Sequence, residues 1–286
     1  MRSVEASSRT DDDWIVNAPS TRWWPELRVR QLWVHRELVA FFALRDLQVR
    51  YKQAFFGAAW AIIQPMIGAL GFTLLFHNLA GVDVPGSSYF AFALVGFGAW
   101  SYFTGTIGSG AGSLVRNANL LTKVSFPRIV APASSWLPGL IDLAVSLVLA
   151  GVATLVAGGS LSPIELVAFL PFGVVLLVVS VAGPALFLSA TVVKYRDAQA
   201  LVSFGLQFLL FVTPVAYPPD LVPVRWRPLL YLNPVAGAIG ALRTALVDAG
   251  SPSGWNLGLS CAVGLLLLII GLVRFRRGER EFADII

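Results

Sequence analysis

Long apolar segments alternate with short polar stretches along most of the chain. Each apolar segment has roughly the 20 mainly apolar residues that a helix needs to cross a bilayer. The pattern therefore predicts an all-α integral membrane protein with six transmembrane helices over residues 53–286, kinked where proline interrupts a run, as at Pro65. The six segments are Phe55–Leu79, Tyr89–Leu114, Ile129–Ala157, Ile164–Val193, Ala200–Tyr217 and Trp255–Val273.

The residues before the first apolar segment divide into a polar part and an amphipathic part. Residues 1–20 are polar and carry an acidic run, which is typical of a disordered cytoplasmic tail. Residues 21–52 mix tryptophan with arginine, a composition that suits the headgroup region, and Val34, Leu38 and Phe41 share a face at helical spacing. We expect an interfacial helical segment here, with a soluble helix packed on a partner as the alternative.

The connection between the last two predicted spans is too long for a turn. Pro218–Gly254 begins with prolines and continues with apolar residues, among which Val235, Ile239, Leu242 and Leu246 recur at helical spacing. This pattern favours two short re-entrant helices before the last span. An ordinary extracellular loop is the alternative.

A short basic and polar island, Leu114–Arg128, separates the second and third apolar segments. Charged residues are costly at the centre of a bilayer, so the island should lie outside the hydrocarbon. It nevertheless keeps apolar residues that a solvated connector would not need, which predicts a docking surface for a soluble partner. The candidate docking residues are Asn117, Asn119, Leu120, Lys123, Val124, Phe126, Pro127 and Arg128.

Composition and charge placement agree with a membrane protein and set its orientation. The 286 residues are 56% hydrophobic and only 13% charged, with a mean hydropathy of +0.73. With a cytoplasmic N-terminus, only Arg225, Arg227 and Arg243 of the 21 Lys and Arg residues face outwards, so both termini are predicted to be cytoplasmic. The net charge is +5, but the charged residues cluster at the ends of apolar runs and not along one soluble face. This placement argues against nucleic-acid binding.

The residue types that catalysis would need are scarce. No GxxxxGK[ST] phosphate loop occurs, His35 and His77 are isolated, and Cys261 is the single cysteine, so we expect neither an enzyme nor a bound metal or cofactor. Asp142 is the one carboxylate well inside a predicted span. A role in a substrate pathway and a structural polar contact are equally open for it.

Five sequence blocks occur in an order that matches a known family. With them the chain resembles, from about Arg36 to its C-terminus, the membrane subunit of ABC exporters for O-antigen, teichoic acid and related polysaccharides. The first two blocks are the specific ones, and residues 1–20 fall outside the family pattern. The blocks are RDLQVRYKQAFFGAAWAIIQP (Arg45–Pro65), NANLLTKVSFPR (Asn117–Arg128), KYRDAQ (Lys194–Gln199), LNP (Leu232–Pro234) and the tail Glu279–Asp284.

This resemblance implies a homodimer in the bacterial plasma (inner) membrane. Each subunit would bind a separate ATPase subunit, which holds ATP and Mg²⁺ and docks on the 114–128 loop, and a lipid-linked glycan would pass between the two membrane subunits. An exporter of drugs or lipids, and a non-transporting accessory subunit of glycan synthesis, are the alternative functions. The candidate pathway residues are Trp100, Tyr102, Phe103, Asp142, Phe204, Phe208 and Phe211, and lipid-facing positions are the alternative for the aromatic ones.

Overall fold

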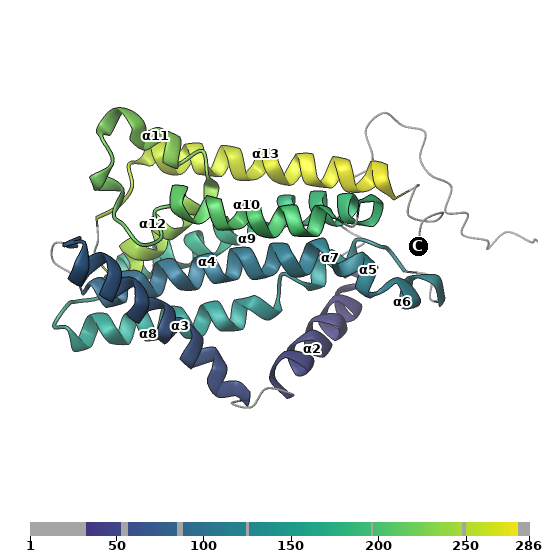
Figure 1. Ribbon diagram of the computed structural model, residues 1–286, viewed down its shortest axis with the longest axis horizontal. Coiled ribbons are helices and arrows are strands. Elements are labelled where there is room, and N and C mark those ends of the chain that lie inside the picture. The colour runs from purple at the N-terminus through teal and green to yellow at the C-terminus, as the bar shows by residue number, and fades with distance from the viewer. Residues whose placement is uncertain are drawn as a thin grey trace, which may run out of the picture.

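The computed structural model describes residues 33–52, 57–84, 88–123, 126–195, 197–247 and 250–279. Throughout these ranges the regular structure is helical, which confirms the predicted all-α class. The predicted tail 1–20 and the first part of the predicted interfacial segment lie outside them. The helices form one elongated bundle (Figure 1).

Helix α4, Tyr89–Ala111, lies at the centre of the bundle (Figure 1). Helices α3, α8, α9 and α12 all pack against it. Most residues of this mainly apolar helix are buried, as expected at the centre of a bundle, and Phe92, Leu94 and Ile107 are almost completely buried. The other spans are arranged around this central helix.

Five segments of the described chain are long and apolar enough to cross a membrane. They correspond to five of the six predicted spans, and the third is broken at 135–137, before Pro138, as its prolines predicted. The fourth instead continues as one helix through Pro171 and Pro184. The five are α3 with the π-helix η2 (Trp60–Phe72 and Thr73–Leu79), α4, α7 with α8 (Val130–Ser134 and Pro138–Val156), α9 (Pro163–Lys194) and α13 (Gly254–Gly278).

The fifth predicted span, Ala200–Tyr217, is only partly helical. Helix α10 covers Ala198–Val212, and its 15 residues extend about 22 Å, less than the roughly 30 Å of a hydrocarbon core. The prediction of a helix to Tyr217 was therefore wrong. Thr213 precedes Pro214 and is extended (φ −83°, ψ 134°), because the proline ring disfavours a helical conformation of the residue before it.

The non-helical segment 213–216 is buried, and Arg243 of α12 satisfies its backbone. The Arg243 guanidinium donates to the carbonyl oxygen of Pro214 at 2.7 Å and to that of Val215. It also donates to the carbonyl of Phe92 at 3.4 Å and lies 3.3 Å from the centroid of the Phe92 ring. Irregular backbone at membrane depth requires such partners from the protein itself.

Two short helices occupy the long connection before the last span, where two were predicted. Helix α11 covers Arg227–Leu230, and helix α12 covers Pro234–Val247. The segments Val224–Leu230 and Pro234–Val247 meet at a bend of 104°, a geometry expected of a re-entrant pair. Almost every residue of α12 is buried, because the helix packs among α4, α9 and α13.

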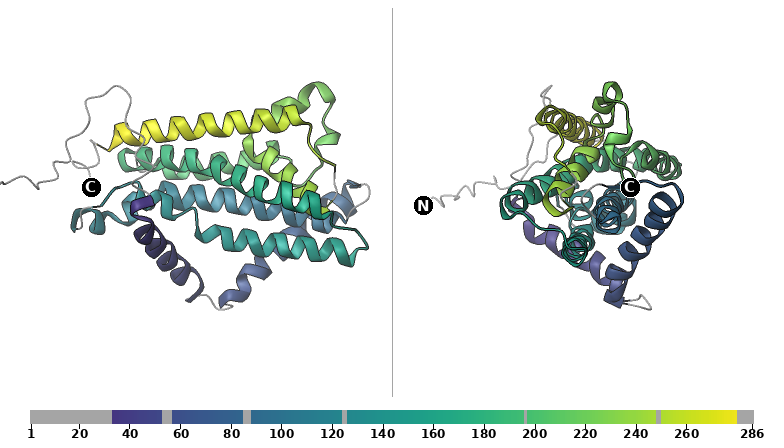
Figure 2. Two further views of the ribbon diagram at one scale, coloured as in Figure 1. Left: turned by 180° about the vertical axis from the view of Figure 1, so that it is seen from behind. Right: turned by 90° about the vertical axis from the view of Figure 1, so that its left-hand side faces the viewer.

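Helix α2, Arg36–Lys52, slants away from one end of the bundle (Figures 1 and 2). It has two apolar faces. Phe42 and Ala43 are buried against the protein, whereas Phe41 and Leu44 on the other side are exposed. A helix with this pattern can rest on the bundle with one face and on lipid with the other.

Candidate functional site

The predicted docking stretch forms a compact helical loop at one end of the bundle (Figure 1). Helices α5 (Ser113–Arg116) and α6 (Ala118–Lys123) continue α4 almost without interruption. At the base of the loop, Leu114 and Ile129 are buried in a cluster with Phe275 of α13. The two ends of the loop are therefore fixed to the bundle by packing.

Three further contacts hold this loop from outside. Arg45 of α2 donates to the side-chain oxygen of Asn117 at 2.9 Å, and the Asn117 amide donates to the Ser113 carbonyl at 2.8 Å. The Phe126 ring packs on Phe42, with centroids 5.7 Å apart. These contacts join the loop to α2.

The third contact reaches the C-terminal end of α13. Arg128 donates to the backbone oxygen of Glu279 at 2.6 Å. Asn117, Phe126 and Arg128, all predicted as docking residues, thus contact other parts of the same chain in the structure.

The outward side of the loop keeps an apolar patch. Val115 and Leu120 are exposed to 42% and 39%, and Asn119 lies beside them on the exposed side. The side chain of Lys123 and all of Val124 lie outside the described residues. Among the predicted docking residues that the structure describes, Leu120 is the apolar one that is exposed.

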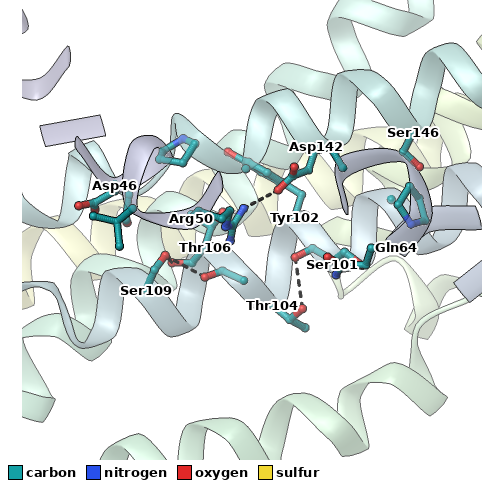
Figure 3. Close-up of a pocket in the computed structure, with 18 of the residues that line it drawn as sticks. Asp46, Arg50, Gln64, Ser101, Tyr102, Thr104, Thr106, Ser109, Asp142 and Ser146 are labelled. Atoms are coloured by element: carbon teal, nitrogen blue, oxygen red, sulfur yellow. Dashed lines mark hydrogen bonds and ion pairs between the residues drawn. The ribbon is translucent and has the colours of Figure 1, made fainter. Parts of the chain in front are cut away.

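A pocket of about 690 Å³ opens beside the loop, between α2, α3, α4 and α8 (Figure 3). This volume is within the range of sites for small organic ligands. Charged side chains of both signs line it, with three arginines against two aspartates. The polar residues that line it are Arg45, Asp46, Arg50, Gln64, Ser101, Tyr102, Thr104, Thr106, Ser109, Arg116, Asn117, Ser135, Asp142 and Ser146.

Asp142 has its partners on α2. Its carboxylate accepts a hydrogen bond from the Tyr51 hydroxyl and forms an ion pair with Arg50 (Figure 3). Burial, followed by the hydrogen bond to Asp142, raises the pKa of Tyr51 to about 12, so the hydroxyl keeps its proton at physiological pH. These two contacts connect α2 to α8.

The predicted pathway residues do not gather in one place. Tyr102 and Asp142 line the pocket, whereas Trp100 and Phe103 are buried in the core with their rings 5.4 Å apart. The three phenylalanines of α10 lie on an exposed helix face, from which they point away from the core. These three are Phe204, Phe208 and Phe211.

The residues that the sequence interpretation missed are the partners from other parts of the chain. Arg50 lies 92 residues from Asp142, and Arg45 lies 72 residues from Asn117. Arg243 lies in the predicted connection before the last span, but its burial against the segment 213–216 was not predicted. The only local signal for Arg243 was a charge within an apolar helical run.

Comparison with known proteins gives consistent results over most of the chain. The family model described as "ABC-2 type transporter" matches residues 37–247. The O-antigen export system permease protein RfbA of Myxococcus xanthus is 30% identical over 258 residues, covering 90% of this chain and 98% of that protein.

Two further relatives have similar coverage. An O-antigen export system permease protein RfbA of Klebsiella pneumoniae is 27% identical over 87% of this chain and 95% of its own length. The polysialic acid transport protein KpsM of Escherichia coli is 23% identical over 86% of this chain and 95% of its own length.

Proposed function

The chain belongs to the ABC-2 type transporter family, and on that premise we propose that it is the membrane subunit of an ATP-driven exporter of a lipid-linked polysaccharide. The chain is homologous to permeases named for O-antigen export and to a polysialic acid transport protein. The cargo proposed here is therefore a glycan carried on a lipid, moved outwards across the bacterial inner membrane.

The observation that carries this proposal is the braced loop between α4 and α7. A loop that transmits force must be stiff and must offer a contact surface. Contacts to α2 and α13 hold this loop, and Leu120 remains exposed on it. We propose that a cytoplasmic ATPase subunit docks on the surface around Leu120 and that its motion reaches α4, α2 and α13 together.

We further propose that two copies of the chain assemble around the transport path, each with its own ATPase subunit. The exposed α10 face supports this arrangement, because Leu201, Phe204, Phe208 and Phe211 recur along one side of the helix and are between 59% and 74% exposed. Such a face suits either a second subunit or an aromatic lining for sugar rings. Exporters of drugs or free lipids remain the second candidate, since the same face is apolar.

The proposed topology places both termini and the 114–128 loop in the cytoplasm. Reporter fusions after Asn119 and Asp197 are expected to report a cytoplasmic position, and fusions after Gly158 and Ser251 an external one, because positive charge is retained on the inside. Alkaline phosphatase and fluorescent-protein fusions measure this directly. A cytoplasmic position for Ser251 would contradict the proposed topology.

Docking is tested by placing a charge in the exposed patch of the loop. Leu120→Asp is expected to weaken ATPase binding at least about tenfold and to abolish glycan transport, because an interface anchor commonly contributes about 2 kcal/mol. Co-purification with the ATPase and transport of labelled lipid-linked glycan are the two measurements.

Two variants serve as controls for that experiment. Asn119→Ala, beside Leu120, changes the surface with little loss of apolar area and should retain most binding. Phe126→Ala removes the contact with Phe42 and should reduce transport more than binding, because it loosens the loop without changing the exposed patch. If Leu120→Asp binds and transports normally, the loop is only a connector and the proposal fails.

A further inference from the structure

The inner wall of the pocket is an open face of α4. Ser101, Gly105 and Ser109 follow one another at one-turn spacing along it and all line the pocket. Gly105 is exposed although α4 is the central helix, and a Cβ atom built on it meets no atom within 4 Å. Close helix packing therefore does not require a glycine at position 105. Because Gly105 has no side chain, the cavity beside it stays open.

The charges of the pocket favour an anion. Arg45 pairs with Asp46 and Arg50 pairs with Asp142. Arg116 donates to the backbone oxygen of Ser109 at 2.6 Å and has no carboxylate partner within the described part of the chain. Among the described residues, one guanidinium of the pocket therefore has no counter-charge, and a guanidinium presents paired N–H donors that match a phosphate.

Apolar residues also line the pocket. Val49 of α2 lines it and is 61% exposed, and Ala61 and Pro65 of α3 line it as well. A ligand that fills the polar cavity and extends along this surface must be amphiphilic.

From these three features we propose that the pocket binds the phosphate group of a lipid. Arg116 contacts the phosphate, the hydroxyls of Ser101 and Ser109 face the polar group next to it, and the hydrocarbon chain leaves along α2 and α3. This site deepens the proposed function, because it places a lipid headgroup beside the docking loop. Membrane phospholipids and the carrier lipid of a glycan share this chemistry.

The test measures lipid binding to the full chain, purified together with its ATPase subunit, by native mass spectrometry. The probe is phosphatidylglycerol, and the matched neutral probe is a glucosyl diacylglycerol with the same acyl chains. Phosphatidylglycerol is expected to bind saturably with one tight site per chain. The neutral lipid is expected to bind at least tenfold more weakly, because it offers Arg116 no anionic group for a charge-assisted contact.

Two variants locate the site. Gly105→Leu fills the cavity without meeting neighbouring atoms near its Cβ and should abolish the tight site. Arg116→Gln should weaken it about tenfold, because it removes a charge-assisted contact. Gly258→Leu on α13, another helical glycine whose Cβ would meet no atom within 4 Å, is the matched control and should bind like the wild type.

The proposal is overturned if the neutral lipid binds equally well or if Gly105→Leu retains the tight site. A polyprenyl diphosphate as a second probe separates the sources: tighter binding than phosphatidylglycerol identifies the carrier lipid, and equal binding identifies the membrane phospholipid. A wild-type chain that transports glycan but shows no tight phosphatidylglycerol site would overturn this inference alone. An intact site in a chain that transports no glycan would instead count against the proposed function.

Discussion

Replacing Arg243 with methionine is expected to destabilise the folded chain by about 2–5 kcal/mol, because buried carbonyl groups lose their hydrogen-bond donor. The methionine fills a similar volume but donates no hydrogen bond. The carbonyls of Pro214 and Val215 then lose this donor inside the protein, at a cost of about 1–3 kcal/mol for each group left unsatisfied. Thermal unfolding of the purified chain, followed by circular dichroism, measures the loss.

Two control variants give this prediction its specificity. Arg225→Met removes an exposed arginine and should change stability by less than about 0.5 kcal/mol. Arg243→Lys keeps a charge and some donors, so part of the stability should return. An Arg243→Met protein as stable as the Arg225→Met protein would show that the buried guanidinium does not hold the 213–216 segment.

A comparably large effect is expected from Gly271→Leu, at the crossing of α13 with α9. A Cβ atom on Gly271 would lie 2.1 Å from the backbone oxygen of Gly183, and a Cβ on Gly183 would lie 2.3 Å from that of Leu267. Because backbone atoms cannot move aside as a flexible side chain can, the two helices must separate. Close approach through small residues is a general source of helix association in membranes.

We therefore expect Gly271→Leu to lose more than about 3 kcal/mol, above the usual range for overpacking, and to accumulate poorly in membranes. Gly258→Leu on the same helix adds the same side chain in open space and should behave as the wild type. Membrane abundance and melting temperature are the measurements. Equal values for the two variants would mean that the crossing can widen at little cost.

Hydrophobic patterning predicted the spans closely where one helix crosses without interruption. The predicted Tyr89–Leu114 and Trp255–Val273 correspond to α4 (Tyr89–Ala111) and α13 (Gly254–Gly278). The predicted end of the fifth span, Tyr217, lies five residues beyond the observed end of α10 at Val212. The residues after Val212 are mainly apolar, and they conceal the effect of Pro214 on the residue before it. Composition identifies which segments are apolar enough to lie in a membrane, whereas a single proline decides where the helix ends.

The site was less predictable, because its contacts join distant residues. Asp142 was recognised as unusual, but nothing near it in the sequence points to Arg50 or Tyr51. The predicted island Leu114–Arg128 connects α4 to α7, and its docking role stays a prediction, yet Phe126 contacts Phe42 within the chain. A helical pattern shows that a residue has an apolar face, but not which neighbour covers it.

The length of α9 has a mechanical consequence. Its 32 residues extend about 48 Å, and even at a tilt of about 40° a core of about 30 Å holds only about 26 of them. About six residues must therefore stand clear of the hydrocarbon. At the end near Lys194, Leu186, Ala190 and Val193 pack on Leu114, Ile129 and Phe275 instead of on lipid. We therefore expect this end of α9 to extend beyond the hydrocarbon and to support the Leu114–Arg128 loop rigidly.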